Sequence, residues 1–330
     1  MPTAIRCEAP KRFYEKCFGQ DDTDLRRTNR MKNILVMGGT SFAGKALVRE
    51  LLRQDYHVTV ATRGQAKVDF EGSVEWVQFE RTDLDSMVTA FSGKAYDVVF
   101  DQIGYCADDV ADACEVFAGK IGHYVFTSSI AAYTTIHTGG MVETDLDLEV
   151  GWVPGRHSTG EIGYGEGKLQ AEAYLAQMAP FPFATARIPI VLGADDPLNR
   201  LGWLVGRILD GAPIVIQPGC GVLGYIGTAE KGRFLTWLGL SGQEGAYNAS
   251  SEPWLDPVEF TRLTGEILGA EPIVLTEGDE PDRMNWINQF DLTMDVSKAR
   301  HAGFEFAEFD QWFPNVVKET AALHTVSKED

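Results

Sequence analysis

A strand–turn–helix segment at residues 33–47, of sequence NILVMGGTSFAGKAL, constrains this chain more than any other stretch. The run Ile34–Met37 has the length and composition of a buried parallel strand. A glycine-rich turn, Gly38–Gly44, follows it and leads into an amphipathic helical pattern. In dinucleotide-binding βαβ units the glycines let the backbone approach a pyrophosphate, and the helix N-terminus offers free N–H groups. The segment therefore predicts a nucleotide site.

The glycine spacing departs from the usual fingerprint at one position. Gly38 and Gly44 are six residues apart, as in Gly-x-x-Gly-x-x-Gly, but Ser41 stands in the middle. A tight turn that needs glycine only for its backbone angles would look similar. The strand before the turn and the βαβ pattern after it favour the nucleotide site. The residues expected to bind the cofactor here are Gly38, Gly39, Thr40, Ser41, Phe42, Ala43 and Gly44.

Strand and helix patterns alternate beyond this turn. Strands are predicted at 33–38, 57–62, 74–79, 97–102, 122–128 and 183–189, with helices at about 42–54, 83–93, 107–118 and 162–178. Strands separated by helices imply a parallel sheet covered on both faces. The predicted fold is α/β, a doubly wound, Rossmann-type parallel sheet with a smaller C-terminal α/β lobe.

Three segments divide the chain. Residues 1–30 are polar and charged and are expected to form a loosely ordered extension. Residues 31–190 are expected to bind the dinucleotide, and residues 191–330 mainly the substrate. In this last part, helices are predicted at 197–209 and 257–268, and a short strand at 214–216.

Composition excludes several classes of function. A formal charge of −19 argues against general binding to nucleic acid or to anionic membranes. The five cysteines are odd in number and lie at no metal-ligand spacing, so neither a disulfide framework nor a metal site is expected. Without an 18-residue apolar run or a signal-peptide core, we expect a cytoplasmic protein.

Two positions bear on cofactor binding, and the first of them bears on the choice between NADP and NAD. The second strand ends at Thr62-Arg63, where an NAD site usually carries a carboxylate that binds the ribose hydroxyls. A guanidinium suits a 2′-phosphate, so the sequence favours NADP over NAD. Glu80, after the third strand, is placed to accept a hydrogen bond from the adenine amino group. The alternatives are an exposed arginine in a turn and a solvated carboxylate.

The ends of the fourth and fifth strands are expected to face the same crevice. After the fourth strand, Ile103-Gly104 would let the backbone pass close beneath a bound cofactor. The fifth strand ends at Ser129, whose hydroxyl would face that crevice. Taken alone, such a serine is more often a helix cap or turn residue.

Tyr164 and Lys168 are four residues apart and share one face of a predicted helix. An ammonium and an oxidised nicotinamide both favour the phenolate, so Tyr164 can exchange a proton with an alcohol or carbonyl as hydride moves. Ser129 would bind the same oxygen, and Lys168 the nicotinamide ribose. The order of glycine turn, strand-end hydroxyls and Tyr-x-x-x-Lys makes a chance match improbable.

On these motifs the chain resembles the extended, atypical short-chain dehydrogenase/reductases of the NAD(P)-dependent epimerase/dehydratase group. The matching segments are GGTSFAG at 38–44, TSS at 127–129, Tyr164-x-x-x-Lys168, RIPIVLG at 187–193, YNAS at 247–250 and DVSKA at 295–299. The resemblance covers roughly residues 31–320. It implies a catalytic Tyr164 with Lys168 and Ser129 as partners, and places Ser128 and Ile190 beside the cofactor.

One departure narrows the reaction. Sugar-nucleotide 4,6-dehydratases carry an Asp-Glu pair directly after the catalytic hydroxyl residue, where this chain has Ile130 and Ala131. The sequence therefore favours reduction, oxidation or epimerisation at a hydroxyl or keto group of a sugar, and the resemblance implies a nucleotide-linked one. Basic residues that could meet its diphosphate are Arg200, Arg207, Lys231 and Arg233.

Other interpretations remain open. Some relatives with this turn are similar to plastid RNA-binding proteins, although the acidic charge speaks against that function here. A cofactor-sensing regulator would not need the intact Ser/Tyr/Lys set.

The acidic connection at 134–163, which contains Glu143 and His157, is expected to be mainly solvated beside the active site. The resemblance also implies a possible homodimer, since relatives often dimerise through a helix pair that would include residues 164–178.

Overall fold

A computed structural model describes residues 32–66, 68–153 and 162–329, which belong to one compact unit. The expectations for residues 1–30 and for His157 lie outside these ranges. Within the described ranges, no helix is long and apolar enough to cross a membrane. No group of three or more His, Cys, Asp or Glu side chains in the same ranges is arranged to hold a metal ion.

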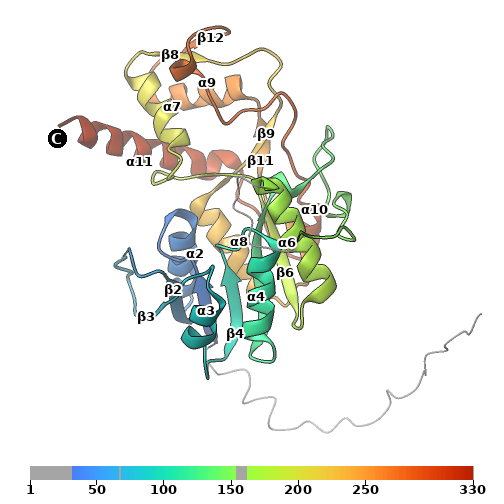
Figure 1. The fold of residues 1–330 in the computed structure, drawn as a ribbon. Helices are drawn as coiled ribbons and strands as arrows, with labels where there is room; N and C mark the ends of the chain where they lie inside the picture. The colour runs from blue at the N-terminus through green and yellow to red at the C-terminus, as the bar shows by residue number, and fades with distance from the viewer. Residues whose placement is uncertain (1–31, 67, 154–161, 330) are drawn as a thin grey trace, which may run out of the picture. The chain divides into compact units, whose positions relative to one another are not determined.

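A seven-stranded sheet forms the centre of the fold, with strand order β10-β6-β5-β4-β1-β2-β3 (Figure 1). Its strands are β1 (Asn33–Met37), β2 (His57–Thr62), β3 (Val74–Gln78), β4 (Tyr96–Asp101), β5 (Ile121–Ser129), β6 (Phe183–Ile188) and β10 (Gly245–Asn248). Every neighbouring pair is parallel. The predicted doubly wound sheet is confirmed.

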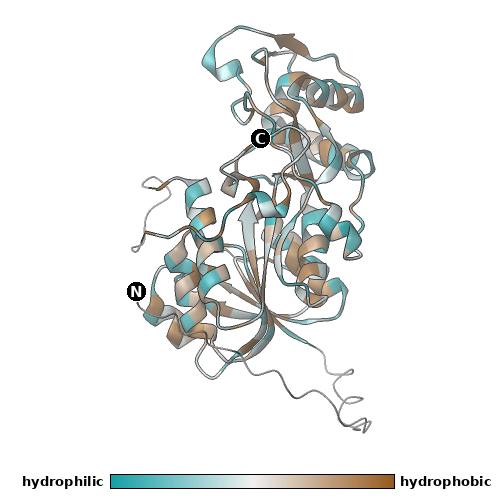
Figure 2. Cartoon of the chain, turned by 90° about the vertical axis from the view of Figure 1, so that its right-hand side faces the viewer, coloured by the Kyte–Doolittle hydropathy of each residue, from teal (hydrophilic) through white to brown (hydrophobic). Residues whose placement is uncertain are grey.

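Helices cover both faces of this sheet. They are α2 (Phe42–Arg53) and α8 (Thr228–Leu240) on one face, and α3 (Leu84–Ala90), α4 (Ala107–Phe117) and α6 (Tyr164–Met178) on the other. Side chains alternate across β1, so Ile34 and Val36 pack with α2 and α8 while Leu35 and Met37 pack with the other layer. Figure 2 shows brown, hydrophobic residues recurring along the helices that flank the sheet. Burial on both faces explains why the strands read as apolar runs.

Local signals fix several helix boundaries. The Asp83 carboxylate accepts a hydrogen bond from the Ser86 backbone N–H, 3.1 Å away, and so caps the N-terminus of α3. The helix expected from residue 197 begins at Arg200 instead. Asn199 adopts a left-handed backbone angle, φ 51°, which is incompatible with helical continuation.

The C-terminal part forms a second, smaller lobe with its own apolar core. It contains β7 (Ile190–Leu192), β9 (Leu223–Gly227) and β11 (Ser251–Leu255) in one sheet, and β8 (Pro213–Val215) and β12 (Ile273–Leu275) in another. Its helices are α7 (Arg200–Leu209), α9 (Pro257–Leu268), α10 (Ser297–His301) and α11 (Phe309–Glu329). Short 3₁₀ turns are η1 (Ile130–Ala132), η2 (Glu143–Asp145) and η3 (Glu280–Asp282). Between these elements the chain returns to the large sheet layer through α8 and β10.

Candidate active site

The glycine turn between β1 and α2 is packed too closely for side chains. Gly38 has φ 90°, and a Cβ there would lie 2.5 Å from the Cγ2 atom of Ile103. A Cβ on Gly44 would lie 2.2 Å from the Gly38 carbonyl oxygen. The Gly38 N–H donates to the carbonyl of Ala61 at 3.0 Å, which ties the turn to β2. The turn therefore brings the backbone and the first turn of α2 directly to the carboxyl edge of the sheet.

A cavity of about 380 Å³ lies beside this turn. Its lining comes from the turn and from the ends of β2, β3 and β4: Gly38, Thr40, Ser41, Thr62, Arg63, Phe79, Glu80, Arg81, Thr82, Ile103, Tyr105 and Asp109. The structure thus brings together six of the predicted cofactor-binding residues, Gly38, Thr40, Ser41, Arg63, Glu80 and Ile103. A larger hollow, about 570 Å³, lies at the far end of α2 beside α8, away from these residues. The smaller cavity joins a bare backbone turn to a helix N-terminus, which is the arrangement that binds the diphosphate of a dinucleotide in βαβ units.

Arg63, expected to decide between NADP and NAD, and Glu80, expected to bind the adenine amino group, both line this cavity. Arg63 is exposed, and among the described residues it forms no ion pair. Glu80 accepts hydrogen bonds from the hydroxyl and the backbone N–H of Thr82, at 3.2 and 3.4 Å. Both charged residues therefore line the cavity, at the ends of β2 and β3.

Asp101, the last residue of β4, holds the loop beneath the cavity. Its Oδ1 atom accepts from the backbone N–H groups of Ile103 and Gly104, at 2.9 and 2.8 Å. Its Oδ2 atom accepts from the Tyr124 hydroxyl at 2.6 Å and from Arg81 at 2.8 Å. The side chains of Asp101, Tyr124 and Arg81 are buried. The sequence reasoning missed Asp101, although a carboxylate at the end of an apolar strand was a visible signal.

Burial and charge act together on this cluster. Burial lowers the pKa of Arg81, but the carboxylate of Asp101 and further negative groups outweigh it and leave that pKa above its ordinary value. Burial, followed by the negative charge of Asp101, raises the pKa of Tyr124 well above its usual range. The guanidinium stays charged and the phenol neutral, so both can donate to Asp101.

Ser129 and Tyr164 meet at the end of β5. Ser129 is the last residue of that strand, and its Oγ accepts from the Ala131 N–H at 3.2 Å. Tyr164 begins α6 directly after Gly163, whose φ of 73° turns the chain into the helix. Tyr164 is 44% exposed, yet the burial of its inner part raises its pKa, whereas its side-chain interaction with Ser129 lowers that pKa. Lowering of the Tyr164 pKa by Lys168 stays a prediction for the complex with oxidised cofactor.

Lys168 lies one helical turn below Tyr164 and is almost completely buried. Its ammonium donates to the carbonyl oxygens of Gly104 and Thr127, at 2.6 and 2.7 Å. Its Nζ atom lies 4.7 Å from the ring centre of Phe126 and 5.7 Å from that of Tyr164. Burial lowers the pKa of Lys168 to about 8, against the opposing effects of nearby carboxylates. An ammonium has three N–H groups, so one remains beyond these two carbonyls.

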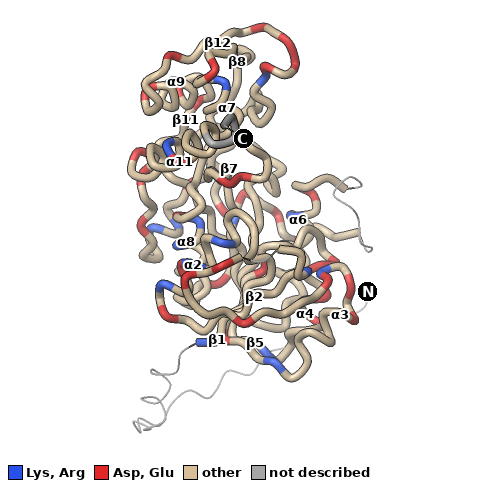
Figure 3. Tube along the Cα trace, turned by 90° about the vertical axis from the view of Figure 1, so that its left-hand side faces the viewer, with Lys and Arg blue, Asp and Glu red and all other residues tan. Residues whose placement is uncertain are grey.

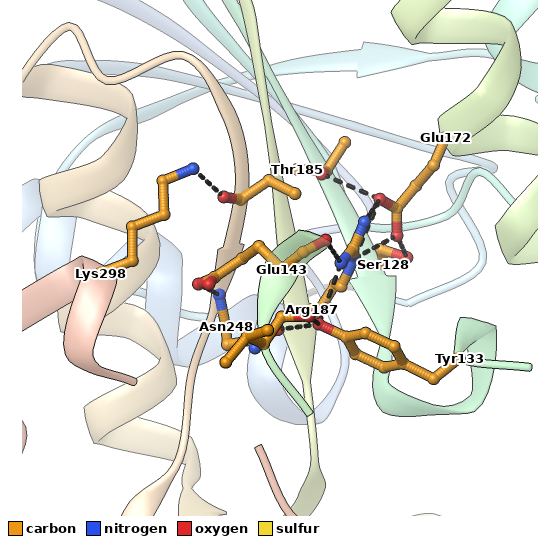
Figure 4. A network of polar contacts seen from close by, with 10 residues as sticks. Ser128, Tyr133, Glu143, Glu172, Thr185, Arg187, Asn248 and Lys298 are labelled. Carbon is orange, nitrogen blue, oxygen red and sulfur yellow. Dashed lines mark hydrogen bonds and ion pairs between the residues drawn. The ribbon is translucent and has the colours of Figure 1, made fainter. Parts of the chain in front are cut away.

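Ser128 belongs to a buried polar network rather than to the cavity lining (Figure 4). Its hydroxyl donates to Glu172 on α6, and Arg187 on β6 donates to the same carboxylate at 2.8 Å. Arg187 also donates to the Tyr133 hydroxyl at 2.9 Å. Tyr133 in turn donates to Asn248 on β10 at 2.7 Å. The network ties α6, β5, β6 and β10 together, and the predicted contact of Ser128 with a cofactor stays a prediction.

Glu143 also takes part in this network. It was expected to be solvated, but its backbone carbonyl accepts from Arg187 at 2.8 Å and its carboxylate accepts from the Asn248 N–H at 2.8 Å. The connection after β5 is therefore anchored to the sheet edge, where the matched segments at 187–193 and 247–250 lie. Residues of these two segments hold the connection in place through contacts between positions far apart in the sequence. The sequence pattern alone did not reveal these contacts.

Three of the four basic candidates in the C-terminal part are ion-paired. Arg200 binds Asp196 at 2.7 Å, Arg207 binds Asp282, and Arg233 binds Glu230. Among the described residues, Lys231 has no such carboxylate partner, although it is buried.

The remaining predicted cofactor residues lie in three places. Gly39 is in the glycine turn, and the first turn of α2 contains Phe42, Ala43 and Gly44. Gly104 follows the end of β4, and Ile190 begins β7.

One curated relative is named for binding stem-loops. The "Chloroplast stem-loop binding protein of 41 kDa b, chloroplastic" of Arabidopsis thaliana is 28% identical over 249 residues, which cover 68% of this chain. The match spans 60% of that relative's length, less than two thirds of it. Its name describes that protein and does not assign the same activity to this chain.

Solved structures share the fold. UDP-glucose 4-epimerase from Thermus thermophilus, in complex with NAD, matches with a TM-score of 0.68 and 18% identity, over 89% of this chain and 99% of the other. UDP-N-acetylglucosamine 4-epimerase from Methanobrevibacter ruminantium M1, in complex with UDP-N-acetylmuramic acid, matches with 0.69 and 17%, over 91% and 99%. At these identities the likeness concerns the fold.

The sequence also matches a family model, over a region that includes the glycine turn and most of the parallel sheet. The model for the "NAD dependent epimerase/dehydratase family" matches residues 34–218, more than half of the chain. The protein is therefore a member of the NAD-dependent epimerase/dehydratase family.

Proposed function

We propose that this protein is an NAD(P)-dependent oxidoreductase or epimerase that acts on a hydroxyl or keto group of a sugar, one linked to a nucleotide. The observation that carries the proposal is the nearness of Tyr164 to Ser129 and Lys168, next to Tyr105, whose side chain lines the glycine-turn cavity. Residues 191–330 are proposed as the main substrate-binding part. Family membership and structures of nucleotide-sugar epimerases with the same fold support this substrate class.

The proposed chemistry divides between cofactor and protein. A bound nicotinamide would supply the hydride acceptor or donor. The glycine turn and the first turn of α2 would bind the diphosphate, and Glu80 the adenine amino group. Tyr164 would move a proton between its phenol oxygen and the reacting sugar oxygen, which Ser129 would orient by a hydrogen bond. Lys168 would stabilise the phenolate and bind the adjacent ribose through its remaining N–H.

The proton transfer is tested by Tyr164→Phe, which removes only the phenol oxygen. The variant should keep its melting temperature and its dinucleotide affinity but lose turnover with UDP-sugars roughly 10²- to 10⁴-fold. Ser129→Ala is the companion variant, with a smaller loss. A folded Tyr164→Phe protein with normal turnover would refute the mechanism.

A stem-loop binding function is the second candidate, because a curated relative carries that description. The formal charge of −19 argues against RNA binding. Figure 3 shows acidic residues both around the large sheet and in the C-terminal lobe. Filter binding of a stem-loop RNA at two salt concentrations separates the two proposals. Phosphate-driven affinity must fall steeply as salt rises, whereas the oxidoreductase proposal expects no appreciable binding at either concentration.

A further inference from the structure

Lys231 is a buried ammonium for which the proposed mechanism has no use. It lies near the start of α8 on the stripe that also carries Phe234, Leu235 and Leu238, which pack on the sheet. Only 8% of the residue is exposed. Within the described part of the chain, its ammonium forms no hydrogen bond or ion pair. A charge removed from water without a partner is unfavourable, so this position needs an explanation.

The packing of α8 against α2 shows where the side chain extends. A Cβ on Gly193 would meet both Thr228, at 2.7 Å, and Phe42, at 2.9 Å. A Cβ on Gly232 would lie 2.9 Å from the carbonyl oxygen of Ala46. The two helices therefore run in the same direction with their first turns side by side. Helical side chains tilt toward the N-terminus, so Lys231 extends toward the level of the glycine turn.

The charge environment of Lys231 agrees with this placement. Burial, and after it the positive charge of Lys168, lower the pKa of Lys231. Lys168 itself is bound to carbonyl oxygens of Gly104 and Thr127, at the ends of β4 and β5. Lys231 therefore approaches the carboxyl edge from the α2 and α8 face, and Lys168 from the α6 face.

Other charged groups near Lys231 are already engaged. On its own helix, Glu230 binds Arg233 and accepts from the Ala307 N–H at 2.9 Å. On α2, Lys45 binds Asp195. Among the described residues, no carboxylate thus pairs with Lys231 at this edge, and an anionic ligand would do so.

We propose that Lys231 binds an anionic oxygen of a diphosphate ligand at the carboxyl edge of the sheet, opposite Lys168. The diphosphate belongs either to the dinucleotide or to a nucleotide-linked substrate, which present the same chemistry. The proposal rests on the proposed oxidoreductase function and adds a residue to its binding site. Because an anion favours the charged lysine, binding near neutral pH must draw a proton from solvent.

The experiment is calorimetric titration of the full chain near neutral pH, in two buffers that differ in ionisation enthalpy. The ligands are NADH and NADPH in one arm, and UDP and UDP-glucose in the other. Lys231→Met should bind the responsible ligand roughly 10- to 100-fold more weakly and lose part of the proton uptake. Lys231→Arg should retain most of the affinity. Arg53→Met removes an exposed arginine at the far end of α2 and is the control, which should leave binding unchanged.

Melting temperatures complete the test. Because the Met variant removes an unpaired buried charge, it should melt no lower than the wild type without ligand. A wild type that binds neither ligand class would overturn the proposed function itself. A wild type that binds, together with a Met variant of equal affinity and equal proton uptake, would overturn only the role of Lys231.

Discussion

The ammonium of Lys168 donates to the carbonyl oxygen of Gly104, 2.6 Å away, and so ties the helix of the proposed proton donor to the loop beneath the cavity. Lys168→Met should therefore reduce turnover roughly 10²- to 10⁴-fold and weaken dinucleotide binding as well. Tyr164→Phe, in contrast, should reduce turnover alone. Steady-state kinetics and calorimetry on the two variants measure the difference. Equal dinucleotide affinity in both variants would contradict this structural role of Lys168.

Asp101 is predicted to be the most sensitive buried residue of the site. Asp101→Asn removes the charge of the buried carboxylate that binds Arg81 at 2.8 Å, so the free energy of unfolding should fall by about 3–5 kcal/mol. Tyr124→Phe removes one neutral donor to the same carboxylate and should cost only about 1 kcal/mol. Urea denaturation of both variants tests the ranking. Similar losses would show that the ion pair contributes little.

The glycine turn can be tested through Gly44. Gly44→Ala brings a Cβ within 2.2 Å of the Gly38 carbonyl oxygen, so the turn must shift at a cost of about 1–3 kcal/mol. Dinucleotide affinity should fall with it. Gly151→Ala is the control, because a Cβ there meets nothing within 4 Å. Unchanged affinity in Gly44→Ala would mean that the diphosphate binds elsewhere.

Arg63 should decide between the two nicotinamide cofactors. It borders the cavity, and no acidic residue stands beside it at the end of β2. Arg63→Ala should weaken NADPH binding roughly tenfold and NADH binding by less than about twofold. Arg53→Ala removes an exposed arginine at the far end of α2 and should change neither affinity. Preference of the wild type for NADH would remove the basis for the NADP proposal.

The parts of the site that could be predicted from the sequence depend on short-range patterns. The β1–α2 turn and the Tyr164–Lys168 spacing each lie within one local segment, and the structure places both at the carboxyl edge. The Glu172–Arg187 pair joins α6 to β6 and depends on strand register, which no local pattern specifies. The return of α8 and β10 to the large sheet was missed for the same reason. Lys231 could be named as a candidate, but its lack of a partner among the described residues appears only in the fold.

The two buried lysines should make stability depend on pH. Burial lowers the pKa of Lys168 to about 8 and that of Lys231 to about 7, from an ordinary value of 10.5. Between pH of about 10 and 7, the unfolded chain then binds protons that the folded chain does not. These groups should therefore lower the free energy of unfolding as pH falls through that window, with no further change below it.

Urea denaturation of the ligand-free protein across this window measures the effect. Lys231→Met removes one of the two groups, so its stability should fall less steeply as pH decreases. Lys318→Met is a suitable control, because that lysine lies at an exposed position on α11. A variant slope equal to that of the wild type would mean that Lys231 keeps its proton in the folded protein. In that case an anion would bind a lysine that is already charged. Lys231→Met would then bind the ligand more weakly than the wild type, with the same proton uptake.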